Sequence, residues 1–195
     1  LVGLDLGAWS YDDLKAPVAD EQRREKLGRV VLVGDAALQP AIDAATAVAA
    51  GYAVARRLAM MPGNVCTPDT FAELGQEMAA RHGLQVAILG RAEMEREGMG
   101  SFLSVAQGTP QDPKLVALEY RNGGDAKPVV LVGKGLCFDT GGINLKPGDG
   151  MWNMKFDMCG AAGVMGAMEA IARLGLTVNV VGVIGSTTNM PSGTA

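Results

Sequence analysis

Short apolar runs rich in β-branched residues alternate along the chain with longer stretches that have the composition of helices. The apolar runs predict strands at residues 28–34, 84–89, 115–120, 128–138 and 178–184. The other stretches predict helices at residues 41–61, 68–82, 91–97 and 160–174. Strands that alternate with helices indicate an α/β protein, which we expect to be a layered α/β/α fold around a central, largely parallel mixed sheet.

The clearest helix boundaries are those of the predicted helix 68–82. Thr67 can cap its N-terminus, Pro68 suits its first position, and Gly83 is well placed to end it. Residues 16–27, by contrast, are polar and charged and predict an exposed turn or a short helix.

The alanine-rich stretch at residues 41–61 indicates where the chain divides. Alanine is the best helix former and no proline interrupts the run, so we predict one long helix and place a domain boundary there. Residues 1–36 would be the C-terminal end of a smaller N-terminal α/β domain, and residues 37–61 a connecting helix. Residues 62–195 would be the N-terminal part of a second, incomplete domain. Both ends interrupt a pattern, so we expect a fragment of a longer protein.

Charge and cysteine content exclude several classes of protein. The net charge of −4 and the lack of a basic cluster leave no electrostatic footprint for nucleic acid. No apolar run reaches the roughly 20 residues that a membrane-spanning helix needs. The three cysteines are odd in number and lack CxxC spacing. They favour a reducing, cytoplasmic location over a disulfide framework or a cysteine-ligated zinc site.

Chemically distinctive residues are densest in residues 129–162, VVLVGKGLCFDTGGINLKPGDGMWNMKFDMCGAA. The apolar start predicts a strand buried on both faces. Charged residues at the C-terminal end of a strand in an α/β sheet typically bind ligands or metals. Asp139 and Asp157 flank a strand–loop–helix turn and can hold a hard cation through their oxygens. The alternative is that both cap turns or helices, as aspartate commonly does.

Two lysines belong to the same segment. Lys134 closely follows the apolar run, so we expect its amine to be buried. Burial disfavours the charged form of an amine, and a neutral amine is a possible metal ligand whereas a charged one is not. The alternative for both Lys134 and Lys146 is a solvated surface position.

Methionines and glycines recur at helical spacing after this loop. We interpret the methionines as core residues, with an apolar substrate pocket as the alternative. The glycines fall on one face of the predicted helix 160–174 and indicate close packing on the sheet rather than a dinucleotide-binding loop. The residues concerned are Met151, Met154 and Met158, and Gly160, Gly163 and Gly166.

Several common catalytic motifs are absent. The triplet at residues 133–135, GKG, does not complete a phosphate-binding loop of the GxxxxGK[ST] type. Neither GxSxG nor HExxH occurs. The only histidine, His82, lies at the predicted end of helix 68–82, where a cation is mildly favourable, and we interpret it as structural.

The segment GKGLCFDTGGINLKP, followed by MKFDMCGAA, resembles the signature of the leucyl (cytosol) aminopeptidases. LGAWSYDDLK is similar to the end of that family's N-terminal domain, and MPGNVCTPDTFAEL to the start of its catalytic domain. NVVGVIGSTTNMPSG resembles the strand and loop that follow the metal-binding helix. The resemblance implies a two-domain, hexameric, cytoplasmic exopeptidase with a leucine-type preference. It also implies peptide substrates with a free N-terminus and two divalent metal ions, Mn²⁺ or Zn²⁺, with Mg²⁺ possible.

The resemblance implies a role for each residue at the site. Lys134 would ligate one metal ion through a neutral amine, Asp157 would bind the same ion, and Asp139 would bridge both ions. Lys146 would polarise the scissile carbonyl and stabilise the oxyanion. Met154 would line the pocket for the N-terminal side chain. Two cations about 3.5–4 Å apart would lower the pKa of a bridging water.

The family's remaining ligands and an arginine lie in an Asn-Thr-Asp-Ala-Glu-Gly-Arg segment, and this chain ends before it. We therefore expect the fragment alone to be inactive. One alternative is a non-catalytic relative that acts as a structural or nucleic-acid-binding protein, although the net charge of −4 disfavours nucleic acid for this segment. Another is a phosphate-binding α/β module, against which the incomplete loop pattern counts.

Overall fold

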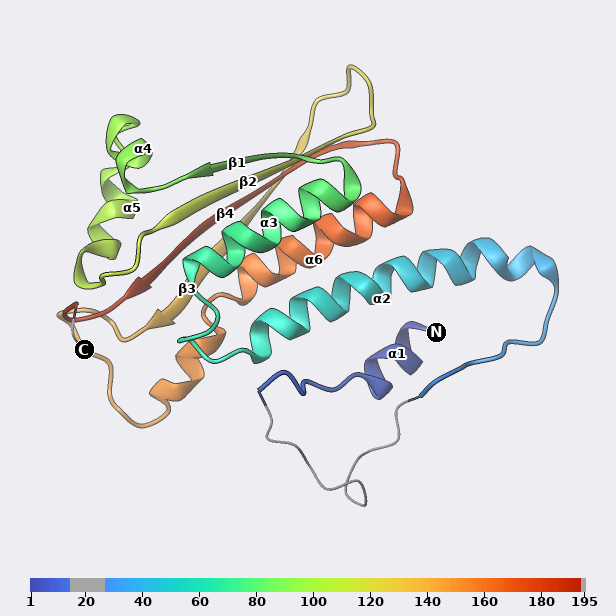
Figure 1. Cartoon of the computed structure of the whole chain (residues 1–195), viewed down its shortest axis with the longest axis horizontal. Helices are drawn as coiled ribbons and strands as arrows, with labels where there is room; N and C mark the ends of the chain where they lie inside the picture. The colour runs from blue at the N-terminus through green and yellow to red at the C-terminus, as the bar shows by residue number, and fades with distance from the viewer. Residues whose placement is uncertain (15–26, 194–195) are drawn as a thin grey trace.

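The computed structural model describes residues 1–14 and 27–193, and Figure 1 shows how their elements are arranged. The helices are α1 (Val2–Ala8), α2 (Gln39–Met60), α3 (Pro68–His82), α4 (Arg91–Arg96), α5 (Gly100–Val105) and α6 (Cys159–Leu174). The strands are β1 (Gln85–Leu89), β2 (Lys114–Arg121), β3 (Val129–Asp139) and β4 (Asn179–Asn189). Short 3₁₀ segments are η2 (Ala36–Leu38), η3 (Ala106–Gly108) and η4 (Met151–Phe156). The predicted turn at residues 16–27 lies, except for its last residue, outside the described residues.

Most elements predicted from the pattern are confirmed, but the strand predicted at residues 28–34 is wrong. These residues have no regular secondary structure, and Val33 is 97% exposed. A strand needs a neighbour to satisfy its backbone groups, and the sheet of the described residues does not include this segment. A β-branched composition alone was therefore insufficient evidence for a strand.

The four strands of the described residues form one mixed sheet in the order β1-β2-β4-β3. The β1/β2 and β2/β4 pairs are antiparallel, and β3 and β4 are parallel. The parallel pair is joined through α6, as a crossover connection requires. The α/β class and the mixed sheet are confirmed, but within the described chain the sheet is not largely parallel.

Helices cover one face of this sheet in two tiers. α3 and α6 pack directly on the strands, and α2 lies on the outer side of α6 (Figure 1). Their side chains and the inward-facing residues of β2 and β4 form the core, which includes Phe71, Met165, Met168 and Ile184. On the opposite face, Phe102 of α5 lies against Gly185. The described residues thus supply one complete helical layer of the expected α/β/α arrangement.

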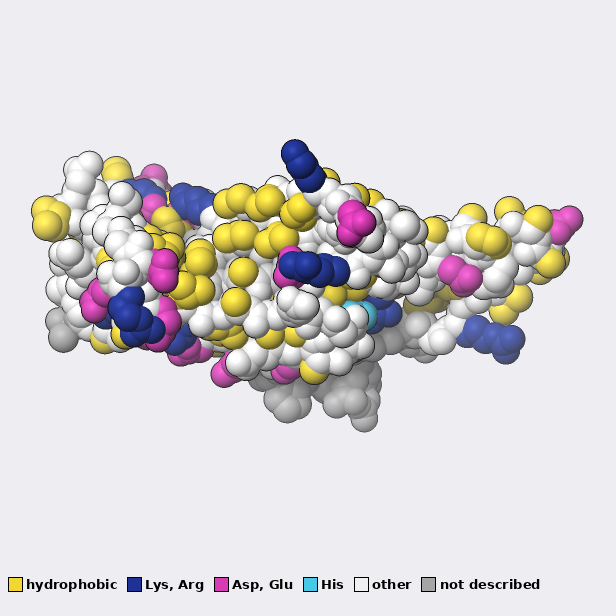
Figure 2. Space-filling view, turned by 90° about the horizontal axis from the view of Figure 1, so that it is seen from above, with side chains coloured by type: hydrophobic (Ala, Val, Ile, Leu, Met, Phe, Trp, Pro, Cys, Tyr) yellow, Lys and Arg dark blue, Asp and Glu magenta, His cyan; other side chains and the backbone are white. Residues whose placement is uncertain are grey.

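The first residues of β3 are exposed, contrary to the prediction of a strand buried on both faces. Val129, Val130 and Val132 are 57%, 55% and 78% exposed. β3 is an edge strand of the described sheet, and Val130 and Val132 belong to the face away from α6. Figure 2 looks onto that face and shows apolar side chains gathered over the sheet. The apolar run correctly predicted a strand, but it did not predict how exposed that strand is within this chain.

The predicted boundaries of α3 agree with the structure. The Thr67 hydroxyl accepts a hydrogen bond from the backbone N–H of Thr70, and the Thr70 hydroxyl accepts one from the N–H of Thr67. Pro68 takes the first helical position, and Gly83 ends the helix with a φ of +69°. These contacts satisfy backbone groups that every helix end leaves without intrahelical partners.

The three glycines of α6 do not all pack on the sheet as predicted. A Cβ placed on Gly160 would lie 3.0 Å from the Lys134 backbone nitrogen of β3, so this glycine does approach the sheet. A Cβ on Gly166 would lie 2.5 Å from the carbonyl oxygen of Gly51 in α2, and one on Gly163 would meet nothing within 4 Å. Helix α6 therefore uses one glycine against the sheet and another against a helix on its outer side.

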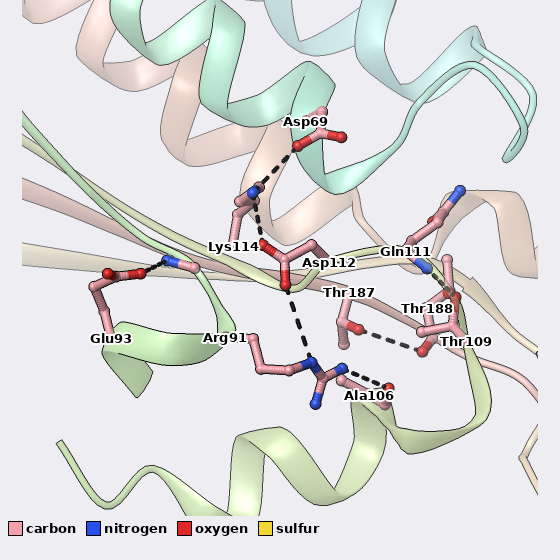
Figure 3. A network of polar contacts seen from close by, with 11 residues as sticks. Asp69, Arg91, Glu93, Ala106, Thr109, Gln111, Asp112, Lys114, Thr187 and Thr188 are labelled. Atoms are coloured by element: carbon pink, nitrogen blue, oxygen red, sulfur yellow. Dashed lines mark hydrogen bonds and ion pairs between the residues drawn. The ribbon is translucent and has the colours of Figure 1, made fainter. Parts of the chain in front are cut away.

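Two polar networks connect the elements of the fold, one between a strand and a helix and one between two helices. In the first, the Lys114 amine of β2 lies 2.8 Å from Asp112 and 3.5 Å from Asp69 at the start of α3 (Figure 3). The hydrogen bond to Asp112 is the main cause that raises the pKa of Lys114. None of the residues labelled in Figure 3 was predicted for the metal site, and we interpret this network as structural.

The second network surrounds Glu169 of α6, which is 1% exposed. Its carboxylate lies 2.5 Å from Arg173, 3.0 Å from His82 and 3.5 Å from Arg81. Burial raises the pKa of this carboxyl, but hydrogen bonds from Arg173 and His82 and the charge of Arg81 outweigh it, so the pKa lies below its ordinary value. The network joins the C-terminal ends of α3 and α6.

Candidate metal and catalytic site

The predicted site residues lie along the second half of β3 and in the segment that joins it to α6. Lys134 and Asp139 belong to β3, Lys146 lies in the loop that follows, and Asp157 is the C-terminal cap of η4, two residues before α6 begins. The loop turns at Gly141 and Gly142, whose φ angles of +92° and +69° favour glycine. The side chains meet as two ion pairs, one between Lys134 and Asp157 and one between Lys146 and Asp139.

In the first ion pair, the Lys134 amine lies 2.7 Å from Asp157 Oδ1. The other carboxylate oxygen, Asp157 Oδ2, is buried and has no hydrogen-bond partner among the described residues. The side chain of Lys134 is 58% exposed, so the expectation that burial would neutralise this amine is wrong for the chain described here. The apolar run before Lys134 lies on an edge strand, which is why it does not bury the lysine.

In the second ion pair, the Lys146 amine lies 2.8 Å from Asp139 Oδ2. It also donates to the Asp139 carbonyl oxygen at 3.2 Å and to the Met154 sulfur at 3.1 Å. The backbone N–H of Lys146 donates to the carbonyl of Thr140 at 2.8 Å. Lys146 is thus fixed at both its backbone and its amine, and Met154 takes part in holding the amine.

Asp139 is the most extensively bonded residue of the site. Its Oδ1 accepts hydrogen bonds from the backbone N–H of Gly141 at 2.9 Å and from Asn189 Nδ2 at 2.8 Å. Burial raises the pKa of this carboxyl, but the hydrogen bonds from Lys146, Gly141 and Asn189 outweigh that effect. The pKa of Asp139 therefore lies below its ordinary value, and the group is a carboxylate at neutral pH.

Asn189 is a residue of the site that sequence reasoning missed. The strand prediction ended at residue 184, whereas β4 continues to Asn189, which pairs with Asp139 across the parallel strands. The signal in the sequence was a polar residue beyond an apolar strand, the position at which α/β sheets place their ligands. It was overlooked because the run of Ser and Thr residues before it does not look apolar.

The three methionines of the predicted helical stripe have different environments. Met158 is fully buried in the core, which confirms the core interpretation for this residue. Met151 and Met154 belong to η4 and are only partly buried. The contact between Met154 and Lys146 places Met154 at the site, but no described contact shows it lining a side-chain pocket.

The donor set fits a divalent cation in its chemistry. Asp139 and Asp157 present hard carboxylate oxygens, and Asp157 Oδ2 is a buried acceptor that otherwise lacks a donor. Within residues 1–14 and 27–193, no group of three or more His, Cys, Asp or Glu side chains is arranged to hold a metal ion. The candidate metal ligands in this part of the chain are therefore two carboxylates, of Asp139 and Asp157, and one amine, of Lys134.

A cavity of about 450 Å³ opens at the same end of the parallel strands. Its wall includes Phe138 and Thr188, the neighbours of Asp139 and Asn189 in sequence, together with Met190 and Asn64. Met154 is not among the residues that line it. This cavity was not anticipated from the sequence, because loops distant along the chain form it.

Comparison with known proteins identifies the family. Residues 53–195 match the catalytic domain of the cytosol aminopeptidase family. The chain belongs to the cytosol aminopeptidase family. It is 47% identical over 194 residues to the probable cytosol aminopeptidase of Azoarcus sp. (strain BH72), a match that covers 97% of this chain and 39% of that protein. It is 50% identical over 192 residues to that of Thioalkalivibrio sulfidiphilus (strain HL-EbGR7), with 96% and 39% covered.

Solved structures agree with this membership of the cytosol aminopeptidase family. The bottromycin maturation enzyme BotP in complex with Mn superposes with a TM-score of 0.86 at 34% identity, covering 100% of this chain and 40% of that one. A second BotP structure gives a TM-score of 0.79 at 34% identity, with 99% and 39% covered. The chain thus spans about two-fifths of the length of the relatives it matches. No helix of the described residues is long and apolar enough to cross a membrane.

Proposed function

We propose that this chain is part of a metal-dependent aminopeptidase that releases N-terminal residues, with a leucine-type preference, from peptides. The observation that carries the proposal is the pairing of Lys134 with Asp157 and of Lys146 with Asp139, along the second half of β3 and the segment that joins it to α6, inside the family match. Its relatives are named probable cytosol aminopeptidases. These names support our proposal of a cytoplasmic location, and the resemblance adds the expectation of a homo-hexamer.

The cofactors proposed are two divalent ions, Mn²⁺ or Zn²⁺, with Mg²⁺ as a further candidate. When bound, they would supply a hydroxide nucleophile near neutral pH and polarise the substrate carbonyl. Asp157 and Lys134 would hold one ion, with the Lys134 amine losing its proton as the metal binds, and Asp139 would contact both. Two observations support this assignment: the Lys134 amine and Asp157 Oδ1 lie 2.7 Å apart, and Asp157 Oδ2 has no hydrogen-bond partner among the described residues. Two carboxylates do not complete a coordination shell, so further ligands would come from another part of the protein.

Lys146 would meet the charge that develops on the carbonyl oxygen during hydrolysis. The structure supports this role because three acceptors, two on Asp139 and the sulfur of Met154, fix the position of its amine. A cation fixed in position before the reaction stabilises the developing charge electrostatically with little reorganisation. A direct hydrogen bond to the oxyanion would replace one of its three present bonds. Met154, which contacts the Lys146 amine, would border the pocket for the N-terminal side chain.

The test is hydrolysis of leucine p-nitroanilide by the full-length protein that contains this chain. We expect activity to disappear when a chelator removes the metal and to return when Mn²⁺ is added. We expect Lys146→Met to lower kcat by about 10²–10³-fold, the usual loss for one oxyanion-stabilising donor. The matched control is Lys127→Met, an exposed lysine between β2 and β3, which should leave kcat unchanged.

Two results would contradict the proposal. One is a full-length protein without metal-dependent hydrolysis, which would favour a non-catalytic relative with a structural or nucleic-acid-binding role. The other is a Lys146→Met variant that keeps wild-type kcat, which would remove this lysine from the mechanism. The 195-residue chain tested alone should show no turnover, and appreciable turnover would show that ligands beyond it are dispensable.

A further inference from the structure

The side chain of Asn189 faces the carboxylate of Asp139 across the parallel strands. Asn189 Nδ2 donates to Asp139 Oδ1 at 2.8 Å, and the two residues are register partners in β3 and β4. An ionised carboxylate only accepts hydrogen bonds, so the amide atom that faces it must be the nitrogen. The amide oxygen then lies toward Gly142, where a Cβ would come within 2.7 Å of it.

This contact distinguishes the two oxygens of Asp139. Oδ1 already accepts from the backbone N–H of Gly141 and from Asn189, which uses its two acceptor positions. Among the residues that the structure describes, the only partner of Oδ2 is the Lys146 amine, at 2.8 Å. The pair of donors on Oδ1 therefore fixes the rotation of the carboxylate and leaves acceptor capacity on Oδ2.

The backbone and the side chain of Asn189 make hydrogen bonds to different residues. Its carbonyl oxygen accepts from the Thr140 N–H at 2.9 Å and from the Thr140 hydroxyl at 2.8 Å. These bonds join the ends of β3 and β4, and a substitution at Asn189 keeps them because they use main-chain atoms. The side-chain amide is left for the carboxylate, so its removal changes the orientation of Asp139 more than the pairing of the strands.

We propose that Asn189 is a positioning residue that orients Asp139 for a divalent cation. The amide of Asn189 holds Asp139 Oδ1 so that Oδ2 can face the cation. It also helps to fix the orientation of the Asp139 carboxylate toward Lys146. This inference rests on the proposed function, because it assumes that Asp139 is a metal ligand. Partners that orient a ligating group typically change metal affinity by about 10–100-fold when they are lost.

The experiment measures Mn²⁺ binding to the metal-stripped, full-length protein by isothermal titration calorimetry. Asn189→Ala removes the amide, and Asn189→Leu keeps a branched side chain without donors. We expect both variants to raise the Kd for Mn²⁺ by about tenfold or more. The control is Asn179→Ala at the opposite end of β4, where the side chain bonds Gly123, Gly124 and Ala126 and lies far along the strand from Asp139.

The melting temperature of the metal-free protein separates positioning from a general structural effect. Asn179→Ala loses three hydrogen bonds, so it should lower this temperature at least as much as Asn189→Ala, yet leave the Kd for Mn²⁺ within about twofold of wild type. An unchanged Kd in both Asn189 variants, beside a wild type that binds Mn²⁺, would overturn the inference and leave the proposed function standing. An equal rise in the Kd for Mn²⁺ in Asn179→Ala would also overturn the inference. A wild type that binds no Mn²⁺ would refute the proposed metal site and this inference together.

Discussion

The crossing of α2 and α6 depends on two glycines, Gly51 and Gly166, whose backbones are in contact. A Cβ on Gly51 would lie 2.4 Å from the Gly166 carbonyl oxygen and 3.0 Å from the Ala170 Cβ. A Cβ on Gly166 would lie 2.5 Å from the Gly51 carbonyl oxygen. The obstructing atoms are backbone, so no side-chain rotation can relieve the clash, and Gly51→Ala must push the helices apart.

Two opposing effects decide the size of the change. Alanine is more favourable than glycine in a helix interior by about 1 kcal/mol. Overpacking of a close contact costs about 1–3 kcal/mol, and the backbone clash here argues for the upper end of that range. The net loss for Gly51→Ala is therefore about 2 kcal/mol, which corresponds to a fall in Tm of about 4–8 °C for a chain of this length.

Gly163→Ala is the matched control, because it lies in the same helix α6 and a Cβ there would meet nothing within 4 Å. Only the helix propensity acts at this position, so we expect a gain of up to about 1 kcal/mol. The two variants should thus differ by about 3 kcal/mol, the sum of the loss and the gain.

The assay is equilibrium unfolding in urea of the purified 195-residue chain, followed by circular dichroism, with a thermal melt in parallel. Gly166→Ala should lose about as much stability as Gly51→Ala, since each Cβ meets the other residue's carbonyl oxygen. If Gly51→Ala is as stable as the wild type or more stable, backbone contact does not determine this crossing and the reasoning is refuted.

Two further predictions concern helix ends and buried charge. Because the pKa of Glu169 is lowered in the folded chain, its stabilising effect is present above the pKa of an unfolded glutamate, about 4.3, and is lost as the pH falls through the lower folded-state pKa. Glu169→Gln should lower the free energy of unfolding by about 2 kcal/mol near pH 7. It should also make the fall in unfolding free energy at acid pH less steep than in the wild type. If that fall is as steep as in the wild type, protonation of Glu169 is not its cause. Thr67→Ala should cost about 1 kcal/mol in urea unfolding through loss of the helix cap, while Thr67→Ser should retain most of it, and equal losses in the two variants would show that the hydroxyl is not what matters.

Features that depend only on neighbouring residues could be predicted from the sequence. The ends of α3 follow from Thr67, Pro68 and Gly83, because capping and left-handed termination are properties of neighbouring residues. The spacing of charged residues along and after β3 likewise pointed to this part of the chain, and the structure pairs Lys134 with Asp157 and Lys146 with Asp139. Their roles toward metal and substrate stay predictions.

Only the tertiary structure decided which residues are buried and which strands and side chains contact one another. The same apolar composition gave an exposed edge at Val132 and no strand at Val33, because strand pairing depends on which segments meet. Glycines with identical spacing in α6 meet a strand, open space or a helix according to what lies opposite each one. The contact of Asn189 with Asp139 joins residues 50 positions apart. By itself the sequence determined most of the helices and strands and the residue types available for chemistry, since these depend on local propensity and spacing. Which groups touch, and which are shielded from water, depends on long-range packing that no local pattern contains.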